Sequence, residues 1–408
     1  MRYSSLTGRI GGHRVTAWDL HAAAAEAQAN GEDVIVLSVG DPDFATPAPI
    51  VQAAVAALAA GDTHYADVLG RTALRRAIAD LHTRRAGQAV GADQVIVLPG
   101  AQNALFAACL CLFEAGDEVI VPEPMYLTYE ACVGAAGATM VTVPQPRALG
   151  LRLDTAALAA SVTPRTRAIL FANPCNPTGL IADTDELAAI ADLARRHDLW
   201  VIVDEVYAAL AFDHPHVSIA ALPGMADRTV TINSLSKSHA MTGWRAGWAV
   251  GPRALIEHMG RLAMCMLYGL PGFVMEAALT AVRDYDRTAA AMCAIYQRRR
   301  DLVLDRLSRV EGIACLPPEA GMFMLVDVSA SGLAAGDFAW ALYDATGVAV
   351  LDAGAFGPST EGMVRLSFAA EDAQLEEACR RIGRFVAGLL AAAPVAPAGP
   401  VAALAHSA

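Results

Sequence analysis

The sequence has few charged and few aromatic residues, and its charge is mostly of one sign. Charged residues make up 18% of the 408 residues and aromatic residues 6%, and 42 acidic residues outnumber 30 basic ones, for a formal net charge of −12. An acidic protein repels the phosphates of nucleic acids and the surfaces of anionic membranes. We therefore expect neither nucleic acid nor a membrane among its partners.

The sequence also lacks the spacings of common metal sites and disulfide frameworks. Its 8 cysteines form no Cys-x-x-Cys pair and its 10 histidines form no His-Glu-x-x-His motif, so no metal site is predicted. Cys109 and Cys111 lie in an apolar run, where cysteine behaves as a small buried hydrophobe. Cysteines of this kind are typical of a reducing compartment, which favours a cytoplasmic protein.

Although hydrophobic residues make up 55% of the chain, the sequence lacks a convincing membrane span. The most apolar stretch without charge, residues 387–405, is broken by Pro394, Pro397, Gly399 and Pro400. Its composition is typical of a low-complexity tail, and we expect residues 391–408 to be flexible. The first five residues lack the apolar segment of a secretory signal, so we expect the protein to stay in the cytoplasm.

From residue 95 onward, short β-branched runs alternate with helical stretches. The runs are 95–98, 118–121, 168–171, 200–203, 229–232 and 246–250. This alternation predicts an α/β fold with a largely parallel, helix-covered sheet. After residue 285 the pattern changes to a long helix over 287–307 and to separated strands, which predicts a smaller α+β domain.

We expect four parts along the chain. They are an N-terminal segment that joins the small domain (1–46), a large domain (47–285), a small C-terminal domain (286–390) and the flexible tail (391–408).

Polar clusters follow four of the expected strands. Because ligands of open α/β sheets bind outside the carboxyl ends of the strands, these clusters predict one shared site. The clusters are Pro99-Gly100-Ala101-Gln102-Asn103, Asn173-Pro174-Cys175-Asn176-Pro177-Thr178-Gly179, Asp204-Glu205-Val206-Tyr207 and Asn233-Ser234-Leu235-Ser236-Lys237.

Two of these clusters contain groups that can bind phosphate. Gly100 opens a helical segment, where free backbone N–H groups at the helix N-terminus attract anions; an ordinary strand-to-helix turn is the plainer interpretation. Ser234, Lys237 and Arg245 add a hydroxyl, an amine and a guanidinium. A lysine at the end of a strand beside phosphate-binding groups suggests Schiff-base chemistry.

Asp204 ends an otherwise apolar strand, where an unpaired carboxylate is costly, so we expect a cationic partner. A protonated pyridine nitrogen would be one, and Tyr207 and Asn176 could then donate hydrogen bonds to a phenolate oxygen on the same ring. The alternative is that Asp204 caps the next helix.

In their order and spacing, these motifs resemble the class I aminotransferases, pyridoxal-phosphate enzymes of the aspartate aminotransferase fold, from about Ser38 to Phe385. The resemblance implies the fold of type I pyridoxal-phosphate enzymes, with a mainly parallel seven-stranded sheet and a smaller α+β domain. The matching motifs are Gly40-Asp41-Pro42-Asp43-Phe44, Tyr65, Gly100-Ala101-Gln102, Asn176-Pro177-Thr178-Gly179, Asp204-Glu205-Val206-Tyr207, Ser234-Leu235-Ser236-Lys237, Thr242-Gly243-Trp244-Arg245-Ala246-Gly247 and Arg365-Leu366-Ser367.

The resemblance also implies roles for individual residues. Lys237 would bind pyridoxal 5'-phosphate covalently and shuttle a proton, Asp204 would hold the pyridine nitrogen protonated, and Tyr126 would stack on the ring. Arg365 would bind the substrate α-carboxylate with its bidentate fork, aided by the backbone of Gly40. The other residues that would bind the cofactor are Gly100, Ala101, Gln102, Asn176, Tyr207, Ser234, Ser236, Arg245 and, from a second subunit of a homodimer, Tyr65.

The overall sequence is most similar to bacterial arginine:pyruvate transaminases, which implies transfer of an α-amino group from L-arginine to pyruvate by a ping-pong mechanism. Such a substrate needs a carboxylate for its guanidinium. We expect Asp19, beside Trp18, to supply it; Glu123 is less favoured because it lies by a turn and would face solvent.

Other functions stay open at this point. The same fold also acts on aromatic, neutral or dicarboxylic amino acids and on cysteine conjugates by β-elimination, and sequence motifs do not separate these activities. Aminotransferase-like domains also occur in transcription regulators. About forty residues before the Gly40 motif and a net charge of −12 argue against that function.

Overall fold

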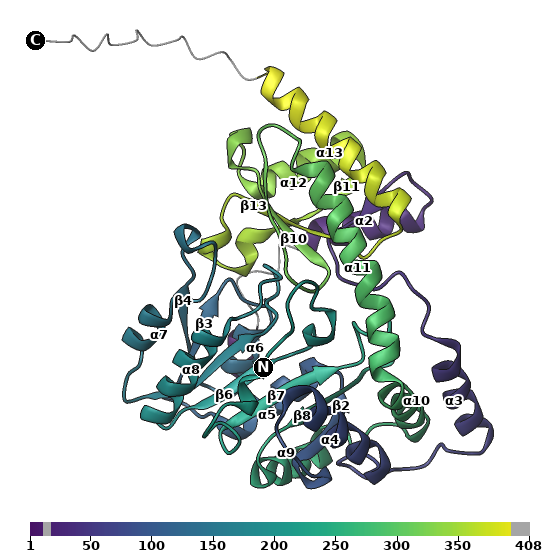
Figure 1. Ribbon diagram of the computed structural model, residues 1–408, viewed down its shortest axis with the longest axis vertical. Helices are drawn as coiled ribbons and strands as arrows, with labels where there is room; N and C mark the ends of the chain where they lie inside the picture. Colours follow the sequence, from purple (N-terminus) through teal and green to yellow (C-terminus); the bar gives the residue numbers. More distant parts are fainter. Residues whose placement is uncertain (11–17, 393–408) are drawn as a thin grey trace, which may run out of the picture.

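The computed structural model of the chain describes residues 1–10 and 18–392. Its largest sheet has seven strands in the order β2, β8, β7, β6, β5, β3, β4 (Figure 1). β8 runs antiparallel to β2 and β7, and the other neighbours are parallel, so the predicted α/β fold with a mainly parallel seven-stranded sheet is confirmed. The strands are β2 (Val95–Pro99), β3 (Glu118–Glu123), β4 (Thr139–Pro144), β5 (Thr166–Ala172), β6 (Trp200–Asp204), β7 (Thr229–Ser234) and β8 (Ala246–Val250).

Both faces of this sheet are covered by helices. In β2, Ile96 and Leu98 pack in one core with α5 and α9, whereas Val95 and Val97 pack in another core with α4 and α10. Burial on both faces explains why the strands are continuous apolar runs in the sequence. The helices of this part are α3 (Ala48–Ala59), α4 (Thr72–Ala86), α5 (Ala101–Leu112), α6 (Tyr129–Ala135), α7 (Thr155–Ala160), α8 (Thr184–Arg196), α9 (Arg253–Met266) and α10 (Gly272–Arg283).

The smaller part contains an antiparallel sheet in the order β12, β13, β10, β9. The long helix α11 (Tyr285–Leu307) runs from α10 up to this part (Figure 1). The other elements here are β9 (Ala314–Leu316), β10 (Phe323–Asp327), α12 (Ala335–Thr346), β11 (Val348–Ala349), β12 (Leu351–Asp352), β13 (Met363–Ser367) and α13 (Asp372–Ala392). Short 3₁₀ helices lie at Ala92–Gln94, Arg147–Leu149, Ala208–Leu210, Ile219–Ala221, Ser329–Ser331, Ala353–Phe356 and Pro358–Thr360.

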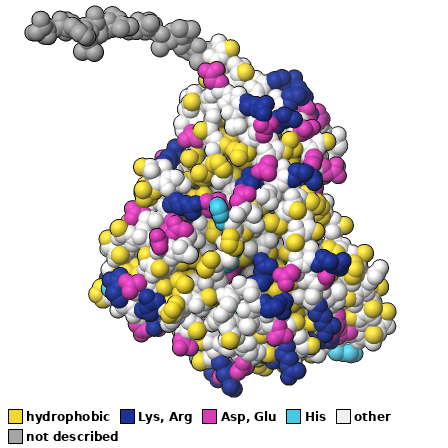
Figure 2. Space-filling model, viewed as in Figure 1, with side chains coloured by type: hydrophobic (Ala, Val, Ile, Leu, Met, Phe, Trp, Pro, Cys, Tyr) yellow, Lys and Arg dark blue, Asp and Glu magenta, His cyan; other side chains and the backbone are white. Residues whose placement is uncertain are grey.

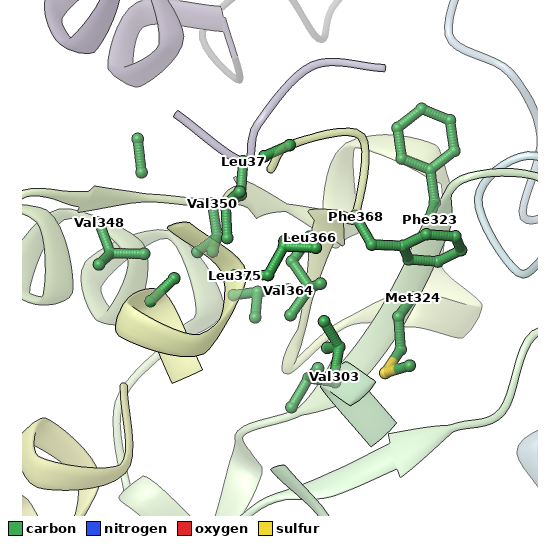
Figure 3. Packing of buried hydrophobic residues seen from close by; sticks show 14 of the residues in the cluster. Leu37, Val303, Phe323, Met324, Val348, Val350, Val364, Leu366, Phe368 and Leu375 are labelled. Atoms are coloured by element: carbon green, nitrogen blue, oxygen red, sulfur yellow. The ribbon is translucent and has the colours of Figure 1, made fainter. Parts of the chain in front are cut away.

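The N-terminal segment joins the smaller part from α2 onward. It contains α1 (Leu6–Arg9), α2 (Asp19–Ala29) and β1 (Ile35–Val36), and β1 pairs in parallel with β11. α1 lies instead against α6 of the larger part, where Nε of Arg9 donates to the carbonyl oxygen of Gly134 at 2.8 Å. Figure 3 shows Leu37 beside Val350, in the same buried cluster as Leu366 and Phe368. This cluster ties the beginning of the described chain to its end; the boundaries of the four parts stay predictions.

Helix α13 continues to Ala392, beyond the predicted beginning of the tail at residue 391, because Leu389 and Leu390 pack against the core. The rest of the predicted tail lies outside the described residues. Across the described ranges, no helix has both the length and the apolar character that crossing a membrane requires. On the face drawn in Figure 2, basic and acidic side chains are interspersed.

Candidate active site

The polar clusters predicted to meet lie around one cavity of about 220 Å³ at the carboxyl ends of β5, β6 and β7. Aromatic side chains and a few charged groups line it together, which is typical of a small-molecule site. Its walls include most of the predicted site residues: Trp18, Gly40, Ala101, Gln102, Tyr126, Asn176, Asp204, Tyr207, Ser234, Ser236, Lys237, Arg245 and Arg365.

Lys237 follows β7 and is the single lysine of the 408-residue chain. Its Nζ donates a hydrogen bond of 2.6 Å to the carbonyl oxygen of Gly40. Burial, assisted by the positive charges of Arg365 and Arg245, lowers the pKa of this amine to about 8, although the carboxylates of Asp41 and Asp204 oppose the shift. An amine with this pKa is partly neutral near pH 8, so it can accept a proton.

Asp204 is the last residue of β6 and contacts the same cavity. Its Oδ2 accepts from the hydroxyl of Tyr129 at 3.1 Å, and its Oδ1 accepts from the backbone N–H of Val206 at 3.2 Å. Burial raises the pKa of the carboxyl to about 6. The next 3₁₀ helix begins after Tyr207, so Asp204 is not its N-cap, and the alternative that it only caps a helix is not favoured.

The phosphate-binding end predicted from the sequence is a tight junction of three segments. Gly100 precedes α5 with a φ of +84°, and a Cβ at this position would lie 2.5 Å from Nη2 of Arg245. Arg245 donates to the carbonyl oxygen of Thr242 at 2.7 Å, and the backbone N–H of Ser236 donates to Oγ of Ser234 at 3.3 Å. The N-terminus of α5, two hydroxyl groups and a guanidinium therefore converge on one end of the cavity, a combination suited to an anion.

Gly247 of β8 lies directly behind this junction, so replacement by alanine is expected to destabilise the protein. The new Cβ would lie 2.5 Å from the backbone nitrogen of Ala101 and from the carbonyl carbon of Gly100. Overpacking of this kind typically costs about 1–3 kcal/mol, and we expect Gly247→Ala to lower the melting temperature by about 1–4 °C. The matched control is Gly243→Ala, whose Cβ would meet no described atom within 4 Å. Equal melting temperatures of the two variants would contradict the prediction.

Arg365 of β13 is the buried cation of the site. Its Nη1 donates to Oδ1 of Asn176 at 3.0 Å and its Nη2 to the carbonyl oxygen of Ser38 at 2.8 Å. Its guanidinium lies over the rings of Phe323 and Phe356, at 3.9 and 4.7 Å from their centroids. Burial lowers its pKa to about 10, and its Nε has no hydrogen-bond partner among the described residues. A buried guanidinium without a carboxylate partner favours an anionic ligand.

Aromatic side chains form much of the remaining wall. Tyr207 is buried edge-on to Phe323, with ring centroids 6.1 Å apart, and burial raises its pKa. Tyr126 packs edge-on to Tyr129, and burial raises the pKa of both hydroxyls. Tyr129 and Phe323 also line the cavity, and neither was predicted from the sequence as a site residue. The only sequence signal for Tyr129 was its spacing of three residues from Tyr126, which puts both on one side of a helical turn.

Three predicted residues do not lie in the cavity wall formed by the described residues: Gly100, which directly precedes the lining residue Ala101, Tyr65 and Asp19. Tyr65 is 86% exposed and packs against Tyr268, with ring centroids 4.8 Å apart. Asp19 is exposed in the first turn of α2, directly after Trp18, which does line the cavity. Trp18 in turn packs edge-on to His21, whose Nδ1 is hydrogen-bonded to Oγ of Ser38.

The expectation that Glu123 faces solvent was wrong. Glu123 ends β3 and is only 1% exposed. Its Oε1 accepts from the backbone N–H of Ser359 at 2.8 Å, because the 3₁₀ helix at Pro358–Thr360 lies over the end of the strand. Glu123 also lies outside the described cavity wall.

Comparisons with known proteins agree with this geometry. A family profile described as "Aminotransferase class I and II" matches residues 32–382. Arginine–pyruvate transaminase AruH of Pseudomonas aeruginosa is 54% identical over 390 residues, which cover 96% of this chain and 99% of the relative. The aspartate/prephenate aminotransferase of Cereibacter sphaeroides is 39% identical, over 90% of this chain and 94% of the relative.

Solved structures give the same result. Aspartate aminotransferase from Thermus thermophilus with maleate has a TM-score of 0.88 at 33% identity, and the match covers 94% of this chain and 100% of the solved chain. Aromatic aminotransferase from Pyrococcus horikoshii has a TM-score of 0.84 at 36% identity, covering 90% and 99% of the two chains. The resemblance predicted from the sequence is confirmed, and the chain belongs to the class I and II aminotransferases.

Proposed function

We propose that the protein uses pyridoxal 5'-phosphate to transfer the α-amino group of L-arginine to pyruvate in a ping-pong reaction. The choice of substrates rests on the 54% identity, over 96% of the chain, to a relative named arginine–pyruvate transaminase. The chemistry rests on one observation: a partly neutral lysine, a buried carboxylate and a buried guanidinium without an acidic partner share one cavity.

The residues of the cavity fit the cofactor. Asp204 faces it with a buried carboxylate whose hydrogen bonds come from Tyr129 and Val206, so a protonated pyridine nitrogen would supply the missing cation. Lys237 would bind the cofactor through its amine, and Tyr126 would stack on the ring. The residues that would bind the phosphate are Gly100, Ala101, Gln102, Ser234, Ser236 and Arg245.

Asn176 and Tyr207 would bind the ring oxygen. Oδ1 of Asn176 already accepts from Arg365, so its amide nitrogen is the donor toward the ring. The Tyr207 hydroxyl stays protonated because burial raises its pKa, and it therefore donates as well. When bound, the cofactor supplies an electron sink that weakens the bonds to the substrate α-carbon.

The side chains of this chain then bind the substrate and move a proton. The guanidinium of Arg365 would take the α-carboxylate, and the rings of Phe323 and Phe356 exclude water from this ion pair. Nζ of Lys237 would accept the proton from the α-carbon and deliver it to the aldehyde-derived carbon of the cofactor, while the carbonyl oxygen of Gly40 orients the amine. The low pKa of the amine keeps a neutral fraction available for this step.

A homodimer would complete the site. Tyr65 is 86% exposed, does not line the cavity of its own chain, and packs only against Tyr268 among the rings described. We assign it to the phosphate of a second subunit, in line with the resemblance stated above. A tyrosine hydroxyl is a suitable hydrogen-bond donor for a phosphate oxygen.

Asp19 is proposed to bind the guanidinium of the donor. It is exposed next to Trp18, whose ring lines the cavity and offers a face for a cation. We expect Asp19→Asn to raise KM for L-arginine about tenfold, the effect of one lost ion pair of about 1.4 kcal/mol, and to leave KM for L-norleucine unchanged. The measurement is the half-reaction with each amino acid, followed by transfer to pyruvate. Preference of the wild type for aspartate or glutamate, with no reaction of arginine, would refute the proposed substrate.

A further inference from the structure

A buried ionic cluster lies outside the cavity, centred on Arg299 of α11. The guanidinium of Arg299 binds the carboxylate of Asp43 with both arms, at 2.7 Å each. Its Nε donates to Oδ1 of Asp372 at 3.1 Å, and its charge lies 4.9 Å from the ring centroid of Phe44. The side chain is only 5% exposed. A bidentate contact in a buried site fixes the geometry of both partners.

Asp43 belongs to a segment with no regular secondary structure, residues 38–47, which contributes Val39 and Gly40 to the cavity wall. Three residues before Asp43, the carbonyl oxygen of Gly40 accepts the hydrogen bond from Nζ of Lys237. Between them, Asp41 accepts from the hydroxyl of Thr242 at 2.7 Å. Because neither a helix nor a strand holds this segment, the position of the Gly40 carbonyl depends on individual contacts. On one side Nη2 of Arg365 binds the carbonyl oxygen of Ser38, and on the other side Thr242 and Arg299 bind Asp41 and Asp43.

The contacts of Arg299 with Asp372 and of its neighbour Tyr296 with Phe44 connect the segment to the smaller part of the molecule. α11 runs alongside α13, and Asp372 is the first residue of α13 (Figure 1). Tyr296, one turn before Arg299, packs edge-on to Phe44 with ring centroids 5.7 Å apart. The cluster therefore joins α11, the beginning of α13 and the segment whose Gly40 carbonyl oxygen accepts the hydrogen bond from Lys237.

We propose that Arg299 is a positioning residue, which acts through Asp43 to hold the Gly40 carbonyl within hydrogen-bond distance of Nζ of Lys237. This inference rests on the proposed role of Lys237 in proton transfer. Arg299 is not among the residues that line the cavity, and its side-chain hydrogen bonds go to Asp43 and Asp372, so it would act on Lys237 through the segment. A misplacement of about 1 Å at a reacting group can lower the rate about a hundredfold.

The neighbouring Arg298 provides a matched control. It pairs with the same carboxylate, Asp372, at 2.9 Å, but its side chain is 61% exposed and its contacts do not include Asp43. Arg298→Met therefore removes an arginine and an ion pair of α11 while leaving the contact to the segment intact.

The test compares holoenzymes of the wild type, Arg299→Met, Arg299→Lys and Arg298→Met. We expect Arg299→Met to lower kcat about tenfold to a hundredfold with KM for the amino donor changed less than about threefold. Amide hydrogen exchange in peptides covering residues 38–46 should become faster in the same variant. Arg299→Lys retains the charge without the fork and should recover part of kcat, and Arg298→Met should match the wild type.

Asp43→Asn keeps the side-chain shape and serves as the second variant if Arg299→Met fails to fold; it should reproduce the loss of kcat and the faster exchange. The inference is overturned if folded Arg299→Met or Asp43→Asn has the kcat of Arg298→Met, or loses thermal stability alone. If Lys237→Ala keeps full activity, the proposed function fails. If Lys237→Ala is inactive while both cluster variants are fully active, only the inference about Arg299 fails.

Discussion

Replacement of Lys237 by alanine is expected to lower kcat for transamination by about 10³-fold or more, because it removes the group to which we assign proton transfer. No other lysine exists in the chain to substitute for it. Rapid-mixing measurement of the half-reaction with L-arginine gives the rate of the chemical step directly. Arg365 and Asn176 remain in place, so binding of the donor should change much less than the rate.

Lys237→Arg is the control that separates charge from proton transfer. An arginine can keep the positive charge and donate to the Gly40 carbonyl, yet it stays protonated at every pH that the protein tolerates. We therefore expect the arginine variant to be as slow as the alanine variant. A rate within tenfold of the wild type in either variant would contradict the assigned role.

Because the chain has no other lysine, chemical reduction of the bond between the cofactor and the protein would report on Lys237 alone. Reduction of the holoenzyme with borohydride should add one pyridoxyl group per chain, which the intact mass reports without digestion. Apart from the N-terminal amine, Lys237 carries the only amine of the 408 residues. Peptide mapping of residues 229–245 should locate the group on Nζ, and cofactor-loaded protein with unmodified Lys237 would refute the attachment site.

The sequence was enough to predict that the polar residues after the strands meet at one site, because their meeting depends only on parallel strands lying side by side. Parallel strands end at the same edge, so the polar residues after β5, β6 and β7 had to meet. Asn176, Asp204 and Lys237 line one cavity for that reason.

The contacts that set the electrostatics could not be predicted in this way, because they form between elements that are distant in the sequence. The hydroxyl of Tyr129 reaches Asp204 from 75 residues away, and Arg299 reaches Asp43 from 256 residues away. Glu123 was expected in solvent, yet a 3₁₀ helix more than two hundred residues later covers it, with its hydrogen bond to Ser359 spanning 236 residues. Burial of a polar group at a strand end depends on such packing and not on the local pattern.

Asp204→Asn is expected to lower kcat about 10²-fold to 10⁴-fold, because a neutral amide cannot stabilise a protonated pyridine nitrogen as a carboxylate can. The backbone N–H of Val206 and the hydroxyl of Tyr129 still find an acceptor in the amide oxygen, so the local structure should be kept. The control is Asp198→Asn, whose side chain is 95% exposed and pairs with Arg228 at the surface. This control should leave kcat unchanged.

The same substitution, Asp204→Asn, should lower kcat but raise the stability of the cofactor-free protein. Burial raises the pKa of Asp204 from 3.8 to about 6, so ionisation of this group destabilises the folded state once the pH rises through this range. Asparagine lacks this penalty, and the melting temperature of Asp204→Asn relative to the wild type should therefore be higher at pH 7.5 than at pH 4. An equal difference at both pH values would show that the carboxylate is not strained by burial. Lower activity together with higher stability would show that the charge of Asp204 serves the reaction and lowers the stability of the cofactor-free protein.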